Sequence, residues 1–253
     1  MNEEEVIRKL RDDPAIFSEY VLDFKPFPYQ IKFLKDKSKR IVVCAGRQVG
    51  KSAMTSARQI WYAIAHEKTT TLIVSATLRQ SMLMFDKILS LAQRSKLVSR
   101  AVSYHTRTHL SFTNGSSIVA LPCGRSGATL RGFSADAVVI DEAAFVPNDV
   151  ISQVILPMVA TTGGTAIMLS TPFDRDHIFY KAFTSSAWSK YQFPSSLNPM
   201  ISSEFLQEQL DLNGQQKFAR EFLAEFVDDE GAYFPMALLR ENIHVCHGGR
   251  ETS

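Results

Sequence analysis

The stretch RIVVCAGRQVGKS, residues 40–52, places a glycine-containing loop directly after a run of apolar, mostly β-branched residues. Its second part matches the phosphate-binding pattern G-x-x-x-x-G-K-[ST], except that Ala45 stands where the pattern has its first glycine. The amphipathic stretch 52–65 follows at once and predicts a helix. Backbone N–H groups and a helix N-terminus bind phosphate in this context. The alternative is an ordinary helix start with an exposed lysine.

Short apolar runs and amphipathic stretches continue to alternate downstream of this loop. We predict strands at Ile41–Ala45, Thr71–Ser75, Ala137–Ile140 and Ala166–Ser170, and helices at Ser52–Ala65, Leu78–Gln93, Asn148–Val159 and Arg175–Thr184. This order is typical of an α/β fold with a mainly parallel sheet, and strands that are apolar on both faces predict helices on both sides. Two β runs around Asn114-Gly115 predict a hairpin, and two further helices are expected at Ser203–Leu212 and Gln215–Glu225.

Two carboxylates, Asp141 and Glu142, end the strand predicted at 137–140. The carboxyl ends of parallel strands share one sheet edge, so we expect this pair beside the glycine-containing loop. There Lys51 would reach the β- and γ-phosphates of a nucleotide, Ser52 and Asp141 would hold Mg²⁺, and Glu142 would orient the attacking water. The alternative is that the two acids only cap the next helix.

Composition excludes several classes of protein. The chain has 253 residues, 45% of them hydrophobic, and a formal net charge of +2, so it can bury a core and is not a disordered protein. The acidic start, residues 1–5, is the wrong sign for a secretory signal, and Pro157 interrupts the longest uncharged stretch, residues 150–173, so no transmembrane helix is expected. Three distant cysteines, Cys44, Cys123 and Cys246, favour a reducing compartment over a disulfide framework. We expect a soluble cytoplasmic protein.

Charge is unevenly distributed along the chain. No Asp or Glu occurs between Lys87 and Ala135, whereas residues 202–230 hold eight acids. A face suited to polyanions is therefore expected. The candidate contacts to a polyanion, of which DNA is one, are Arg94, Lys96, Arg100 and Arg107. Each of these is also explained as part of a solvated helix face or of a subunit interface.

These motifs together resemble the ATPase domain of phage large terminase subunits, the motors that pump DNA into capsids. The likeness rests on GRQVGKS at 46–52, VIDEAAF at 139–145 and LSTP at 169–172, with PYQ at 28–30, TLRG at 129–132 and REFLAEF at 220–226. It implies a P-loop fold of the additional-strand class, with one more strand between the strand before the loop and the acidic strand. It also implies an ATPase core over 1–200, a helical lid over 201–230 and a linker over 231–253 toward a nuclease domain that this sequence lacks.

The resemblance also implies residue roles. Catalytic roles fall to Glu142, Lys51, Arg131 and Arg47, and nucleotide binding to Tyr29, Gln30, Gly46, Arg47, Gln48, Val49, Gly50, Lys51, Ser52, Ala53 and Thr171. Tyr29 and Gln30 would lie on the adenine side, Thr171 near the γ-phosphate, and Arg47 would sense the nucleotide. Arg131 would act as an arginine finger on the neighbouring subunit of a ring. Alternatively, Arg131 pairs with Asp136 or Glu142, and Tyr29 and Gln30 are structural.

The function implied is Mg²⁺-dependent ATP hydrolysis that drives double-stranded DNA into a procapsid. The implied partners are DNA, the portal protein, the procapsid, the small terminase subunit and further copies of the chain, in the host cytoplasm and away from membranes. Two other functions fit the motifs: a helicase-like DNA translocase, for whose second lobe this chain has no room, and a nucleotide-switched binding module.

Overall fold

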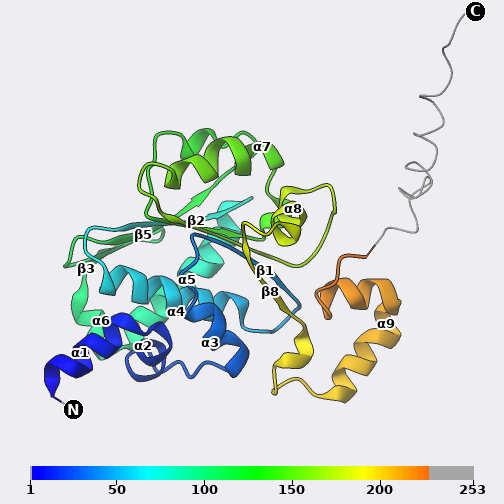
Figure 1. The fold of residues 1–253 in the computed structure, drawn as a ribbon, viewed down its shortest axis with the longest axis horizontal. Helices are drawn as coiled ribbons and strands as arrows, with labels where there is room; N and C mark the ends of the chain where they lie inside the picture. The colour runs from blue at the N-terminus through cyan, green and yellow to red at the C-terminus, as the bar shows by residue number, and fades with distance from the viewer. Residues whose placement is uncertain (1, 228–253) are drawn as a thin grey trace, which may run out of the picture.

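The strand before the glycine-containing loop lies near one edge of an eight-stranded sheet (Figure 1). The structure is a computed structural model that describes residues 2–227. Its strands are β1 (Arg40–Ala45), β2 (Thr70–Ser75), β3 (Val102–His105), β4 (His109–Phe112), β5 (Ser117–Pro122), β6 (Ala137–Asp141), β7 (Thr165–Ser170) and β8 (Ser189–Phe193). Their order across the sheet is β3-β4-β5-β2-β6-β7-β1-β8. All neighbours from β5 to β8 are parallel, whereas β4 is antiparallel to both of its neighbours.

Helices cover both faces of this sheet, as the apolar strands predicted. They are α1 (Glu3–Asp12), α2 (Pro14–Tyr20), α3 (Pro28–Leu34), α4 (Lys51–Ala65), α5 (Leu78–Arg94), α6 (Lys96–Ala101), α7 (Asn148–Val150), α8 (Ile178–Thr184) and α9 (Ser203–Glu221). Helices α1 to α6 lie on one side of the sheet, and α7 and α8 lie on the other (Figure 1). Alternate residues of β1 enter the two cores, with Ile41 and Val43 on the first side and Val42 and Cys44 on the second.

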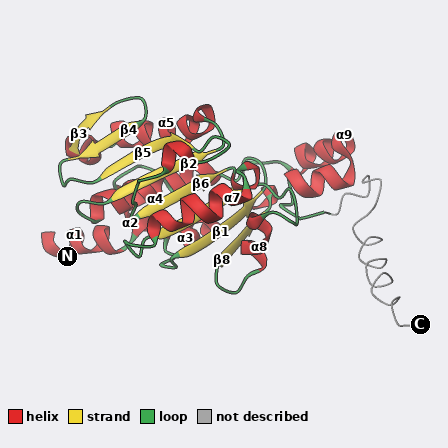
Figure 2. Ribbon diagram, turned by 90° about the horizontal axis from the view of Figure 1, so that it is seen from above, coloured by secondary structure: helices red, strands yellow, loops and turns green. Residues whose placement is uncertain are grey.

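The predicted α/β fold of the additional-strand class is confirmed. Strand β7 lies between β1 and β6 and is parallel to both, which is the expected insertion. Figure 2 shows the sheet from above, with β3 at one edge and β8 at the other. The hairpin around Asn114-Gly115 is also present, as β4 and β5. The Asn114 amide donates to the carbonyl of Ala63 at 2.8 Å, so the turn is tied to the end of α4.

Several helices and strands of the structure were not predicted from the sequence or have different bounds from the predicted ones. Strands β3 and β8 were not predicted, because they are short edge strands with few buried side chains. The single helix predicted at 148–159 is instead α7, a π turn (Ile151–Ile155) and a 3₁₀ turn (Leu156–Val159). Pro157 has no N–H to donate, which interrupts a regular α-helical ladder. Helix α8 starts at Ile178 rather than Arg175, because the His177 side chain accepts a hydrogen bond from the N–H of Phe179 and caps the helix.

The segment after residue 200 is helical, as predicted. Gly214 has non-helical backbone angles (φ 74°, ψ 165°) and separates the two expected helices within α9, which ends at Glu221 rather than at residue 225. Beyond α9 the chain returns to the sheet, where Phe222 and Ala224 are buried. The predicted linker 231–253 and Cys246 lie outside the described residues. Within residues 2–227 no helix is both long and apolar enough to cross a membrane.

Candidate nucleotide site

Three chain segments meet at the carboxyl edge of the sheet because β6, β7 and β1 are neighbours. The glycine-containing loop follows β1, Thr171 follows β7, and the acidic pair ends β6. They surround a cavity of about 600 Å³. The residues around it are Gly46, Arg47, Gln48, Val49, Gly50, Lys51, Ser52, Gln80, Leu83, Met84, Lys87, Asp141, Glu142, Phe145, Thr171 and Glu221. The sequence-predicted loop and acidic pair are thus brought together in one cavity.

The carbonyl groups of the loop are bound by other parts of the protein. The Ser195 hydroxyl donates to the carbonyl of Arg47 at 2.7 Å, and the Asn198 amide donates to that of Gln48 at 2.6 Å. The carbonyl of Val49 accepts from the Tyr29 hydroxyl at 2.8 Å and from the Gln30 amide at 3.1 Å. With its carbonyls held in this way, the loop is built to turn N–H groups toward the cavity. The N–H groups of Gly46 and Arg47 already donate to the carbonyls of Phe193 and Glu221, so the donors left for an anion are the N–H groups that follow them in the loop.

The loop backbone has a shape that few residues adopt. Gly50 has φ +76°, and a Cβ at this position would lie 2.7 Å from the Gln30 amide nitrogen. Gln48 has φ +62°, which is a strained conformation for a side-chain-bearing residue. Helix α4 begins at Lys51, so its first N–H groups and the positive end of its dipole face the same cavity. The loop therefore has the geometry and the electrostatics of a phosphate site.

Lys51 and Glu142 face each other across the end of β7. The Lys51 ammonium lies 2.8 Å from Glu142 Oε1, and the Ser170 hydroxyl donates to Glu142 Oε2 at 3.3 Å. Glu142 makes no side-chain cap bond to the 3₁₀ turn that follows it (Ala143–Phe145), and its own backbone has φ +51°. The arrangement therefore does not match the helix-capping alternative for Glu142. The small hydroxyl side chains of the LSTP stretch were expected near the γ-phosphate, but the contact of Ser170 to Glu142 was not predicted.

Asp141 is buried, with 7% of its surface exposed, and its Oδ1 has no hydrogen-bond partner among the described residues. The pKa of its carboxyl is raised to about 6, chiefly by burial; the charges of Lys51 and Lys87 lower this pKa and that of Glu142 raises it. An unpartnered buried carboxylate oxygen is costly unless a cation or a donor satisfies it. Asp141 is therefore suited to hold a cation together with other ligands.

Replacing Asp141 with Asn is expected to stabilise the protein at pH 8 in the absence of Mg²⁺. The folded-state pKa lies above the ordinary value of 3.8, so the folded protein binds this proton more tightly, and stability is lost as the pH rises through about 6. The expected gain is roughly 2–3 kcal/mol at pH 8 and vanishes toward pH 4. Urea unfolding of both proteins at the two pH values measures it. An equal difference at both pH values would contradict the prediction.

The end of α9 also lines the cavity, through Glu221. Arg47 Nε lies 2.6 Å from Glu221 Oε2, and the Arg47 N–H donates to the carbonyl of Glu221 at 2.8 Å. This contact was not predicted. Ser195 and Asn198 were also missed, because they follow the unpredicted strand β8. A polar run directly after a strand is the signal that would have found them.

The remaining sequence-predicted nucleotide residues lie around the loop rather than in the cavity wall. Tyr29 and Gln30 lie behind the loop, where the Gln30 side chain also accepts from the N–H of Phe27 at 3.0 Å. The Tyr29 ring stacks on Phe27 with centroids 5.9 Å apart. Ala53 follows Ser52 in the first turn of α4 and does not line the cavity.

Arg131 lies on the exposed loop between β5 and β6, away from the cavity lining of its own chain. Its side chain forms no ion pair with Asp136 or Glu142 in the described part of the chain. Instead Glu142 pairs with Lys51, and Asp136 accepts from the N–H of Thr70 at 2.8 Å. The structural alternative for Arg131 is therefore not observed.

The four candidate DNA contacts gather at the other edge of the sheet. Arg94 ends α5, Lys96 and Arg100 lie in α6, and Arg107 lies in the turn between β3 and β4. All four side chains are exposed. They lie near strand β3, at the opposite edge from β8, so they form a basic area separate from the cavity.

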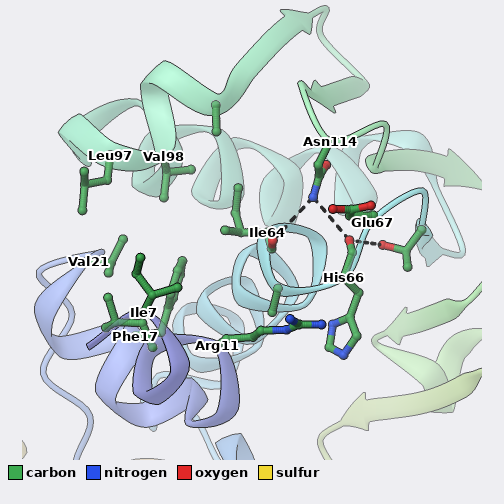
Figure 3. Close-up of a pocket in the computed structure, with 14 residues that line it drawn as sticks. Ile7, Arg11, Phe17, Val21, Ile64, His66, Glu67, Leu97, Val98 and Asn114 are labelled. Atoms are coloured by element: carbon green, nitrogen blue, oxygen red, sulfur yellow. Dashed lines mark hydrogen bonds between the residues drawn. The ribbon is translucent and has the colours of Figure 1, made fainter. Parts of the chain in front are cut away.

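A second cavity, of about 810 Å³, lies between α1, α2, α6 and the end of α4 (Figure 3). Its walls are largely apolar, with Ile7, Phe17 and Val98 among them. Figure 3 shows Asn114 donating to backbone carbonyls at the end of α4. This cavity lacks the combination of loop, cation and acidic pair that marks the first one.

Comparisons with known proteins agree with this geometry. A family model described as "Terminase large subunit, T4likevirus-type, N-terminal" matches residues 42–241. The terminase large subunit of Thermus virus P23-45 is 28% identical over 182 residues, which cover 66% of this chain and 37% of that protein. The chain thus matches little more than a third of the length of this relative.

Solved structures share the fold. The large terminase ATPase domain of Thermus phage P74-26 superposes with a TM-score of 0.76 at 25% identity, covering 85% of this chain and 99% of that domain. The large terminase of a thermophilic bacteriophage, solved in complex with ADP, has a TM-score of 0.68 at 15% identity, covering 80% of this chain and 54% of that protein.

Proposed function

This chain belongs to the family of terminase large subunits, and we propose that it hydrolyses ATP with Mg²⁺ to drive double-stranded DNA into a procapsid. The observation that carries the proposal is the cavity in which Lys51 of the loop lies 2.8 Å from Glu142 of the acidic pair. Two neighbours add support: the P74-26 structure is an ATPase domain, and the terminase of the thermophilic bacteriophage was solved with ADP. The proposed site residues are those that the sequence analysis named.

The chemistry follows from the charges around the cavity. A triphosphate in the loop brings oxygens that compete with Glu142 for the Lys51 ammonium. Glu142, once released, is placed to accept a proton from a water that attacks the γ-phosphate. The Ser170 hydroxyl holds the other carboxylate oxygen and so limits the positions that Glu142 adopts. Thr171, at the end of the same strand, would lie near the γ-phosphate.

Mg²⁺ would be held by Ser52 and Asp141 together with phosphate oxygens. The fit rests on the unpartnered, buried Oδ1 of Asp141 and on the position of Ser52 in the first turn of α4. Within residues 2–227 no three His, Cys, Asp or Glu side chains are grouped to hold a metal by themselves. Shared binding with the nucleotide is typical of Mg²⁺. When bound there, the ion would neutralise charge that develops on the phosphates.

Other parts of the chain would couple ATP hydrolysis at the site to the movement of DNA. Arg47, paired with Glu221, would report the presence of the nucleotide to α9. We propose that α9 belongs to a helical lid over residues 201–230, which is attached to an ATPase core over 1–200. Tyr29 and Gln30 would lie near the adenine, and Arg131 would reach the ATP of the next subunit in a ring. Arg94, Lys96, Arg100 and Arg107 would contact the DNA backbone. The portal, procapsid and small terminase subunit are the further partners that this role requires.

Replacing Lys51 with Ala tests the proposed site. The wild-type protein is expected to bind ATPγS and to hydrolyse ATP, and the variant is expected to lose at least about tenfold in ATPγS affinity, because a charge-assisted phosphate contact is removed. Isothermal titration and steady-state phosphate release measure the two effects. Lys190→Ala, which removes an exposed lysine of β8, is the control. Equal binding by Lys51→Ala and wild type would contradict the site.

A nucleotide-switched binding module is the alternative function. It predicts ATPγS binding with no turnover even when DNA, portal protein and procapsid are present. Phosphate release that rises when these partners are added favours the motor.

A further inference from the structure

Helix α5 forms a part of the wall of the nucleotide cavity that is separate from the loop. Four of its residues face the cavity: Gln80, Leu83, Met84 and Lys87. Their spacing of three, four and seven residues places them on one helix face. Helix α5 packs against α4, with Met84 and Phe85 buried, so this face has a firm position relative to the loop.

The cations around the cavity are not equivalent. Arg47 and Lys51 come from the loop, and each is paired with a carboxylate, Glu221 at 2.6 Å and Glu142 at 2.8 Å. Lys87 is exposed and forms no hydrogen bond or ion pair with any other residue in the described range 2–227. It is therefore the cation of this cavity whose ammonium is available without breaking a contact.

A triphosphate with one Mg²⁺ still carries a net negative charge that the site has to balance. The two loop cations face three carboxylates of the same cavity, Asp141, Glu142 and Glu221. A further cation on α5 improves the charge balance for an anionic ligand. A lysine is suited to this place because its flexible four-carbon stem lets a compact charge reach a phosphate oxygen.

We propose that Lys87 is a second phosphate-binding lysine, which reaches the terminal phosphate of the nucleotide from α5. This inference rests on the proposed function and deepens it. Lys87 lines the cavity of its own chain and binds the phosphate from α5, whereas Arg131 lies outside this cavity. The terminal phosphate of ATP is its γ-phosphate, which ADP lacks, so a contact of Lys87 to this phosphate favours ATP over ADP.

The test is isothermal titration of ATPγS, ADP and AMP, each with Mg²⁺, into wild type, Lys87→Gln, Lys87→Arg and the exposed-lysine control Lys190→Gln. We expect Lys87→Gln to weaken ATPγS binding about tenfold and ADP binding less than about threefold, because one charge-assisted contact is lost. Lys87→Arg keeps the charge and should restore most of the ATPγS affinity. Lys190→Gln should bind all three nucleotides as wild type does.

The binding of ATPγS by Lys51→Ala and Lys87→Gln distinguishes a failure of the proposed function from a failure of the role of Lys87. If the proposed function is wrong, wild type and Lys51→Ala bind ATPγS equally poorly. If only the role of Lys87 is wrong, Lys51→Ala loses affinity while Lys87→Gln binds ATPγS like wild type. An equal loss for ATPγS and ADP would also overturn the proposal, since it would make Lys87 a general counter-charge to the acidic pair. Circular dichroism of each variant shows whether it is folded.

Discussion

Replacing Glu142 with Gln is expected to abolish ATP hydrolysis while ATP binding survives. The change removes the proton acceptor but keeps the size of the side chain and a hydrogen-bonding oxygen for Lys51, which lies 2.8 Å away. A general base contributes about 10²–10⁴-fold to a rate, so kcat should fall by this factor. Phosphate release measures turnover, and titration with ATPγS measures binding.

The variant Ser170→Ala distinguishes the role of Glu142 as a proton acceptor from the role of the hydroxyl that binds Glu142. The Ser170 hydroxyl donates to Glu142 at 3.3 Å, so Ser170→Ala should lower kcat by a much smaller factor than Glu142→Gln does. Near wild-type hydrolysis by Glu142→Gln would mean that another group accepts the proton. A loss of ATPγS binding in Glu142→Gln would instead assign the residue to the architecture of the site.

Replacing Arg131 with Ala is expected to abolish turnover without weakening ATP binding. Arg131 is exposed, lies outside the cavity of its own chain and forms no ion pair among residues 2–227, so the proposed role is an action on the ATP of a second subunit. An arginine finger is worth about 10³–10⁵-fold in kcat. Because the side chain is exposed, its removal should leave the melting temperature nearly unchanged. Phosphate release and thermal unfolding measure the two quantities.

Mixing two inactive variants tests the contribution in trans. Arg131→Ala keeps Glu142, and Glu142→Gln keeps Arg131, so a ring of both contains sites with a complete set of groups. Activity should appear on mixing and should rise with protein concentration, in the presence of DNA and the portal. A mixture that stays inactive at every concentration, while each variant still binds ATPγS, would rule out a finger that acts between subunits.

Much of the fold could be predicted because its signals are local. The apolar runs at 41–45, 71–75, 137–140 and 166–170 became β1, β2, β6 and β7. Edge strands β3 and β8 were not predicted, because a strand with only one neighbour in the sheet buries few side chains and so needs few apolar residues. The helix predicted at 148–159 was too regular, because local periodicity does not reveal how Pro157 alters the hydrogen-bond ladder.

The candidate site, like the fold, was predicted only where its residues form a local motif. The loop at 45–52 and the acids at 141 and 142 are contiguous motifs, and the sheet order brings them together as expected. The groups that hold them come from elsewhere: Ser195 and Asn198 bind the loop carbonyls, Glu221 pairs with Arg47, and Lys87 lines the same cavity from α5. No motif assigned these residues to the site.

The sequence by itself determined the strand, loop and helix of the proposed phosphate site and the acidic strand beside it. Each of these is encoded by neighbouring residues whose backbone preferences and apolar pattern act over a few positions. Only the tertiary structure decided which side chains complete the cavity and which cations are already paired. Residues such as Arg47 and Glu221 are far apart along the chain, and their contact exists only once the sheet has placed both segments at one edge.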